Sequence, residues 1–356
     1  MTAVFNYSNP LVIHWGPASL TQLEVQLQKL HAQRVMLVTA RSILANASLF
    51  DTVRHALGAI AAPATVVIGQ HAPISEVEAA VHRATEADVN GIVSFGGGSA
   101  IDAAKMVAVR VADQRGPAGS SLPHVAIPTT LSVAELASGA GYTDVAGNKA
   151  GARDPRMLPD AVIYDAELTM ATPLQLWLST GIRALDHAVE GFLADGLHPF
   201  SDVMALEAVR RLFSSLPRTK AEPENVDLRT ENQLAAWFSY TLPAPTAGGL
   251  SHVMGKQIGA RYGIPHGVTS CLLMPHVMRY LAREKPEKML ELAKTTGAGT
   301  SPLDAADDVE RLIASLWLPQ HIRAYGLGEA QLREAAGAVA GQYPAADLLA
   351  IYSAAL

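Results

Sequence analysis

The sequence predicts an open α/β domain followed by an all-helical domain. In the first half, short β-branched or apolar runs alternate with amphipathic helical patterns, which is typical of βαβ units and a mostly parallel sheet. One of these runs ends in three consecutive glycines, directly before a helical pattern. After Thr169 the strand signals end and helical patterns continue. We therefore expect domains at residues 1–158 and 159–356.

Taken in order, the expected elements of the first domain are as follows. Strands are expected where apolar runs are short, at residues 35–39, 65–69, 91–95 and 124–128. Helices are expected where apolar residues recur at helical spacing, at residues 20–30, 42–57 and 74–87. Residues 139–159 are rich in Gly, Asp, Asn and Pro and predict a loop or hairpin before the domain boundary. The second domain shows helical patterns at residues 173–194, 199–215, 227–240, 247–262 and beyond.

Composition excludes several classes of protein. The 356 residues are 49% hydrophobic and 17% charged, which is typical of a globular protein with enough chain for two cores. The net charge of −6 argues against nucleic acid or an anionic membrane as partner. Cys271 is the only cysteine, so no intrachain disulfide forms. Residues 1–9 lack the pattern of a signal peptide and no apolar run is long enough for a membrane helix, so we expect a cytoplasmic protein.

The stretch GIVSFGGGSAIDAAK, residues 91–105, predicts an anion site. Glycines directly before a helix leave backbone N–H groups open to a ligand, and the helix dipole adds partial positive charge there. A diphosphate suits this arrangement. The stretch matches neither the G-x-G-x-x-G fingerprint nor the P-loop. The alternative is a tight turn from strand to helix with no ligand.

Three of the twelve histidines fall in a pattern with two cations. On a helix, residues four apart share a face, so Arg183 lies on the side of His187 and Lys256 on the side of His252. His266 follows in the turn IPHG. If the two helices face each other, these side chains meet in one pocket. The alternative is that each histidine is an ordinary helical residue and each cation is solvated.

Asp186 lies about 100° from His187 around the same helix. We therefore expect its side chain to point away from the pocket.

Five segments resemble the iron-containing (group III) alcohol dehydrogenases, whose fold is like that of dehydroquinate synthase, and most of all the maleylacetate reductase branch. They are GGGSAIDAAK, PTTLSVAELASGAGYTD, MLPDAVIYDAELT, GIRALDHAVEG and GLSHVMGKQIGARYGIPHGVTSCLLMPHVM. The resemblance implies an N-terminal dinucleotide-binding α/β domain, a C-terminal helical domain, NADH or NADPH as cofactor, and a homodimer.

By the same resemblance, two segments are expected to bind the cofactor. The glycine segment matches the family's pyrophosphate loop, with Lys105 also on the helix that follows, and the second segment lines the adenine and nicotinamide side. These residues are Gly96, Gly97, Gly98, Ser99 and Asp102, then Thr129, Thr130 and Leu131.

Cofactor choice depends on the end of the second strand, where an NAD-specific protein often places an acidic residue against the ribose 2′-OH. This sequence has Ala40 and Arg41 there, with no acidic group beside them. NADPH is therefore permitted alongside NADH.

The family's metal site is written D-x-x-x-H, followed by two further histidines. His187, His252 and His266 match the histidine positions, but Arg183 stands at the aspartate position. A divalent cation about 4 Å from a guanidinium is repelled by about 8 kcal/mol at an effective dielectric constant near 20. We therefore expect no catalytic iron or zinc, and no metal-binding residues.

These residues predict a metal-independent NAD(P)H-dependent reductase of an unsaturated or oxo carboxylic acid, similar to maleylacetate reductase, which converts maleylacetate to 3-oxoadipate. Arg183 would bind a carboxylate of this small substrate. His187, His252, His266 or a buried Lys256 would supply the proton.

Three alternatives stay open. They are a metal-dependent alcohol dehydrogenase or aldehyde reductase, a non-redox enzyme such as a dehydroquinate synthase-type lyase, and a dinucleotide-binding module without catalysis.

Overall fold

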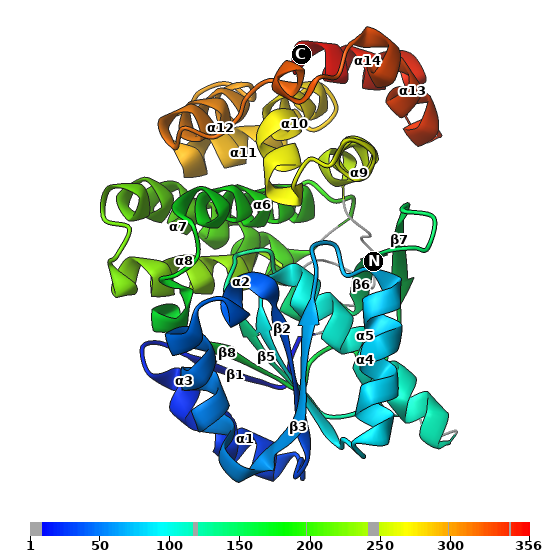
Figure 1. Cartoon of the computed structure of the whole chain (residues 1–356). Coiled ribbons are helices and arrows are strands. Elements are labelled where there is room, and N and C mark those ends of the chain that lie inside the picture. The colour runs from blue at the N-terminus through cyan, green and yellow to red at the C-terminus, as the bar shows by residue number, and fades with distance from the viewer. Residues whose placement is uncertain (1–8, 117–119, 197, 241–248, 298, 342) are drawn as a thin grey trace. The chain divides into compact units, whose positions relative to one another are not determined.

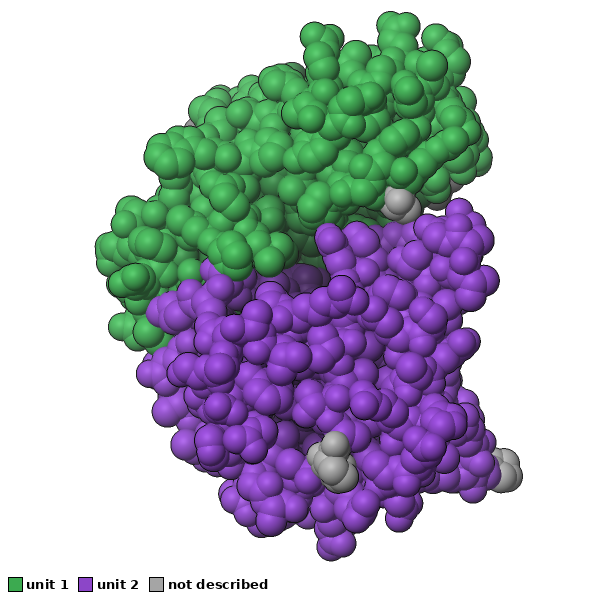
Figure 2. Space-filling view, in the orientation of Figure 1, with its two compact units in different colours: residues 1–7, 173–356 green, residues 8–172 purple. Residues whose placement is uncertain are grey.

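The computed structural model describes residues 9–116, 120–196, 198–240, 249–297, 299–341 and 343–356. They form two compact units, which Figure 2 colours separately. The α/β unit is Ser8–Thr172, and the helical unit contains Pro173–Leu356. The predicted fold class is therefore confirmed.

The described residues of the α/β unit contain a six-stranded parallel sheet with the order β1-β8-β5-β4-β2-β3. Its strands are β1 Val12–Trp15, β2 Val35–Ala40, β3 Ala61–Ile68, β4 Gly91–Gly96, β5 His124–Pro128 and β8 Ala161–Tyr164. Its α-helices are α1 Leu23–Lys29, α2 Arg41–Leu44, α3 Ala47–Leu57, α4 Ile74–Glu86 and α5 Gly98–Arg115. An antiparallel hairpin, β6 Gly139–Thr143 and β7 Lys149–Arg153, occupies the predicted turn-rich segment.

Helices cover both faces of this sheet (Figure 1). Along β2, Met36 and Val38 face the core under α4 and α5, whereas Val35 and Leu37 face the core under α1 and α3. Successive side chains of a strand point to opposite faces, so a strand buried on both sides is apolar throughout. This is why the strands appear in the sequence as continuous apolar runs.

Two details of the α/β unit differ from the sequence expectations. The single helix expected at residues 42–57 is wrong, because Asn46 interrupts it and caps α3, accepting a hydrogen bond from Leu49 N at 3.2 Å. The first unit also extends to Thr172 rather than 158, because β8 pairs with β1 and β5 in the sheet.

The helical unit is built around α6, which is buried from Trp177 to Phe192. Its α-helices are α6 Leu174–Phe192, α7 Pro199–Ala221, α8 Val226–Ser239, α9 Leu250–Tyr262, α10 His266–Leu281, α11 Pro286–Thr296, α12 Asp304–Ser315, α13 Glu329–Val339 and α14 Ala345–Ala354. Residues 247 and 248 of an expected helix lie outside the described residues.

Close approach of α10 to α6 depends on Gly267. A Cβ at this position would lie 2.6 Å from the carbonyl oxygen of Ser179, a distance no side chain tolerates. The contact brings the first turn of α10 against the first half of α6. Among the described residues, no helix is both long and apolar enough to cross a membrane.

Candidate active site

The middle of α6 presents four polar side chains in succession: Arg183, Asp186, His187 and Glu190. Their spacing of three and four residues places them on adjoining parts of one helix face. All four are buried, with exposed fractions of 7% or less. Because the interior excludes water, each of them needs a partner within the protein.

Arg183 is the centre of a buried hydrogen-bond network. Its Nη1 donates to Asp186 Oδ2 at 3.2 Å and to Ser270 Oγ at 2.9 Å. Its Nη2 contacts the imidazole of His252 on α9. Asp186 Oδ2 also accepts hydrogen bonds from Ser251 Oγ at 3.0 Å and Ser270 Oγ at 2.6 Å. Residues of α6, α9 and α10 thus hold one guanidinium in place.

The expectation that Asp186 points away from this cluster is wrong. Asp186 lies about 100° from His187 around the helix, but its partner is Arg183, three residues earlier and about 60° away. The two side chains therefore meet as an i,i+3 ion pair. Burial raises the pKa of Asp186, and Arg183 is the largest influence opposing that rise.

His187 and His252 lie together, as the sequence predicts. Their ring centroids are 5.5 Å apart, and the rings of His187 and Tyr240 lie nearly perpendicular to each other with centroids 5.1 Å apart. Burial lowers the pKa of both imidazoles well below the usual value, and the charges of Arg183 and Lys256 lower it further. Both rings are therefore neutral at neutral pH.

Lys256 and His266 complete the predicted set. Both are close enough for their charges to lower the pKa of His252. His266 is the first residue of α10, whereas Lys256 lies one turn after His252 on α9. The expected burial of Lys256 is wrong, because its side chain is exposed. The described structure thus brings all five predicted catalytic residues into one region of the helical unit.

Glu190 belongs to this cluster of side chains, although the sequence analysis does not predict it. Its carboxyl group accepts hydrogen bonds from the backbone N–H of Gly249 at 2.8 Å and of His252 at 2.9 Å, and so caps the first turn of α9. Burial, and then the charge of Asp186, raises its pKa to about 8. The helix that carries His252 and Lys256 is therefore held by a carboxyl group that is mostly protonated at neutral pH.

These side chains do not fit a divalent metal ion. The Arg183 guanidinium contacts the imidazole of His252, where a metal bound to that ring would meet a fixed positive charge. Among the residues that the structure describes, no three His, Cys, Asp or Glu side chains converge as a metal site requires.

In the α/β unit, the glycine run joins β4 to α5 at the carboxyl edge of the sheet. Gly96 adopts a φ of +151°, which residues with a side chain rarely adopt. The 18-residue α5 begins at Gly98, so its positive end points into this turn. Such a backbone fits the diphosphate of a dinucleotide.

The other predicted cofactor residues lie beside this turn. Thr129 N donates to Gly96 O at 3.0 Å, and a Cβ on Gly97 would lie 3.2 Å from Thr130 Cγ2. Leu131 is buried, and Ser99 Oγ accepts a hydrogen bond from His71 N at 2.9 Å. The two segments that the resemblance assigns to the cofactor are therefore neighbours.

Asp102 has partners within the protein. Its Oδ2 accepts a hydrogen bond from Gly141 N at 2.9 Å, and its Oδ1 lies 3.0 Å from Lys105 Nζ. Lys105 is fully buried and donates to the carbonyl oxygens of Ala134, Ala137 and Gly139. This pair holds the chain that follows residues 129–131, which are predicted to bind the cofactor, against α5.

The expectation that no acidic group lies near Ala40 and Arg41 is wrong. Arg41 Nη2 is 3.1 Å from Glu76 Oε1, on α4. The two residues are far apart in the sequence, so the pairing carries no local signal.

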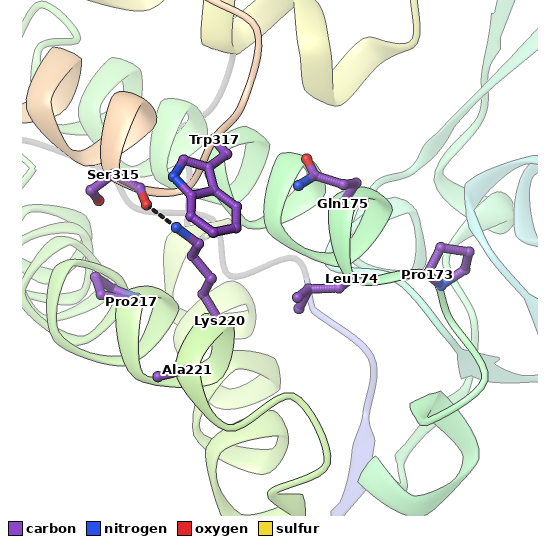
Figure 3. Close-up of a pocket in the computed structure, with 8 residues that line it drawn as sticks. All are labelled: Pro173, Leu174, Gln175, Pro217, Lys220, Ala221, Ser315 and Trp317. Carbon is purple, nitrogen blue, oxygen red and sulfur yellow. Dashed lines mark hydrogen bonds between the residues drawn. The ribbon is translucent and has the colours of Figure 1, made fainter.

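A cavity of about 580 Å³ lies elsewhere in the helical unit and contains none of the predicted site residues (Figure 3). Lys220 reaches across it, with Nζ 3.3 Å from the centroid of the Trp317 ring and 2.5 Å from Ser315 O. The ammonium group of Lys220 therefore already has partners in the Trp317 ring and the Ser315 carbonyl oxygen.

Both halves of the chain match the same protein family, and a known protein is similar to most of the chain. Residues 10–166 match the sequence pattern described as iron-containing alcohol dehydrogenase, and residues 177–347 match that of the Fe-containing alcohol dehydrogenase family, C-terminal. Maleylacetate reductase of Pseudomonas aeruginosa is 31% identical over 85% of this chain and 82% of its own length.

Solved structures are also similar to this chain over nearly its whole length. Maleylacetate reductase from Agrobacterium tumefaciens is 25% identical with a TM-score of 0.87, covering 100% of this chain and 98% of that one. A 1,3-propanediol oxidoreductase is 26% identical with a TM-score of 0.91, covering 99% and 100%.

Proposed function

This chain belongs to the iron-containing alcohol dehydrogenase family and is an NAD(P)-dependent oxidoreductase, and from that premise we propose that it is a metal-independent reductase of an unsaturated or oxo dicarboxylic acid. Reduction of maleylacetate to 3-oxoadipate is the proposed reaction. The observation that supports this most is Arg183, which the family resemblance aligns with the metal-binding aspartate and which is held by Asp186, Ser270 and the imidazole of His252. The similarity to maleylacetate reductases supports the substrate class.

The glycine turn holds the dinucleotide in this proposal. The backbone of Gly96, Gly97 and Gly98 and the first turn of α5 bind the diphosphate, and Thr129 to Leu131 line the neighbouring wall. When bound, the reduced nicotinamide supplies a hydride to the substrate C=C or C=O.

Arg183 binds a carboxylate of the substrate. Its Nη1 is held by Asp186 and Ser270, so the guanidinium has one orientation before the substrate arrives. The carboxylate takes the Nη2 donor that otherwise contacts His252. A charge-assisted contact of this kind contributes about 1.5–3 kcal/mol and selects acids over simple aldehydes.

The proton comes from Lys256 or His266. His187 and His252 have lowered pKa values and are neutral at neutral pH, so they are poor acids. Lys256 lies one turn from His252 and is exposed, and a solvent-exposed lysine ammonium is a proton donor at neutral pH. Hydride and proton together saturate one double bond, and the substrate gains two electrons.

The proposal is tested by the loss of NAD(P)H absorbance with maleylacetate and with simple aldehydes, before and after chelation. We expect turnover of maleylacetate that survives chelation, and no turnover of the aldehydes. Turnover of aldehydes or diols that chelation abolishes would instead identify a metal-dependent dehydrogenase.

We also propose that the protein is a homodimer, on the resemblance to the family. Light scattering of the purified protein tests this.

A further inference from the structure

Arg41 and Glu76 form an ion pair at the carboxyl edge of the sheet in the α/β unit. Arg41 is the first residue after β2 and Glu76 lies in the first turn of α4, which follows β3. Because β2 and β3 are parallel neighbours, both side chains emerge at the same edge of the sheet. Their N–O distance is 3.1 Å.

Arg41 lies one strand away from the glycine turn, and Glu76 follows the next strand of the order β4-β2-β3. β2 also pairs with β4, which carries Gly96, and a Cβ on Gly96 would lie 3.6 Å from Ala40 Cβ. In dinucleotide-binding sheets the adenosine ribose lies at the end of the strand beside the phosphate turn, where an acidic side chain accepts a hydrogen bond from its 2′-OH. The end of β2 has no acid of its own, but Arg41 at this position contacts the Glu76 carboxylate, with Nη2 3.1 Å from Oε1.

Glu76 and Arg41 differ in how firmly the protein holds their side chains. Glu76 Oε2 accepts the backbone N–H of Gly69 at 2.5 Å, and the missing side chain of Gly69 leaves room for that carboxylate. The Glu76 side chain is 27% exposed, whereas the Arg41 side chain is 75% exposed. The carboxylate is therefore fixed by the protein, and the guanidinium is free to reorient in water.

We propose that Glu76 determines the choice of cofactor, by accepting the ribose 2′-OH of NADH and repelling the 2′-phosphate of NADPH. This inference rests on the dinucleotide site of the proposed function. Arg41 reduces the discrimination, because its charge offsets that of Glu76. A carboxylate about 6 Å from a doubly charged phosphate across water changes affinity by about tenfold.

Two nucleotide fragments test the proposal without any turnover. ADP-ribose and 2′-phospho-ADP-ribose are titrated by calorimetry into the wild-type protein, Glu76→Gln, Arg41→Ala and the control Glu78→Gln. Glutamine retains an oxygen that accepts the Gly69 N–H, so the fold at this edge is kept. Glu78 lies on the same helix, 63% exposed, and pairs instead with Arg110 at 3.9 Å.

We expect the wild-type protein to bind ADP-ribose more tightly than its 2′-phosphate. Glu76→Gln should shift the ratio of the two dissociation constants about tenfold toward the phosphorylated fragment, and Arg41→Ala should shift it the other way. Glu78→Gln should leave the ratio unchanged.

Binding of both fragments with the same ratio in wild-type protein and Glu76→Gln would overturn the role of Glu76 while leaving the dinucleotide site intact. Tighter binding of 2′-phospho-ADP-ribose by the wild-type protein would also overturn it. Failure of the wild-type protein to bind either fragment would refute the dinucleotide site, and the proposal with it.

Discussion

Asp186→Asn tests the buried network most sharply. The substitution removes a negative charge and keeps the shape of the side chain. Asp186 Oδ2 lies 3.2 Å from Arg183 Nη1, and the side chains are 1% and 6% exposed, so no water replaces the lost partner. Removing one partner of a buried ion pair costs about 3–5 kcal/mol because the remaining charge is uncompensated. We expect the free energy of unfolding to fall by that amount.

The measurement is urea denaturation followed by circular dichroism, as a double-mutant cycle with Arg183→Met. Removing both charges should restore part of the stability, so that the double variant is at least about 2 kcal/mol more stable than the sum of the single effects predicts. Asp307→Asn is the matched control, because it breaks an ion pair with Arg279 whose side chains are 46% and 32% exposed. It should cost about 1 kcal/mol or less.

A cost of Asp186→Asn no larger than that of the control would show that Arg183 and Asp186 do not form a stabilising buried ion pair. Strictly additive effects of Asp186→Asn and Arg183→Met would show the same, because additivity means that the two groups do not interact.

Three further predictions follow from the same contacts. Arg183→Lys keeps the charge but loses the planar donor pair, so KM for maleylacetate should rise about tenfold or more in steady-state assays, and an unchanged KM would contradict carboxylate binding at Arg183. Burial raises the pKa of Glu190 from 4.5 to about 8, so between these pH values the folded state binds a proton that the unfolded state does not. The contribution of Glu190 to the free energy of unfolding should therefore be complete below pH 4.5 and should be lost as pH rises to about 8. Glu190→Gln should flatten this decline in urea midpoints, and an equal slope in both proteins would exclude Glu190 as its source. Gly267→Ala should destabilise the protein by about 1–3 kcal/mol, because its Cβ would lie 2.6 Å from Ser179 O. Gly337→Ala in α13, where nothing lies within 4 Å, should be neutral or stabilising, and equal thermal midpoints for both variants would count against the close contact.

Local sequence predicts those parts of the fold that depend on local physics. The strands at β2, β4 and β5 are apolar runs because both of their faces are buried, and the turn before α5 is marked by its own glycines. Sequence patterns do not predict β1 and β8, because each strand has four residues and is too short to show periodicity. The split between α2 and α3 depends on one capping side chain, Asn46.

In the candidate site, too, local patterns predict some residues, whereas other contacts depend on the tertiary structure. Helical spacing and family resemblance predict the grouping of Arg183, His187 and His252. The partners of Arg183 on the facing helices, such as Ser270, and the pairing of Arg41 with Glu76 depend on tertiary contacts between distant segments. No pattern in one stretch of chain contains that information.

Metal content of the active enzyme tests the central claim most directly, namely that a guanidinium replaces the metal among the imidazoles. Protein purified without chelators and turning over maleylacetate is analysed for iron and zinc by mass spectrometry. We predict that both elements stay far below one atom per chain while activity is full. One atom of iron or zinc per chain, lost together with activity on dialysis against a chelator, would contradict the account.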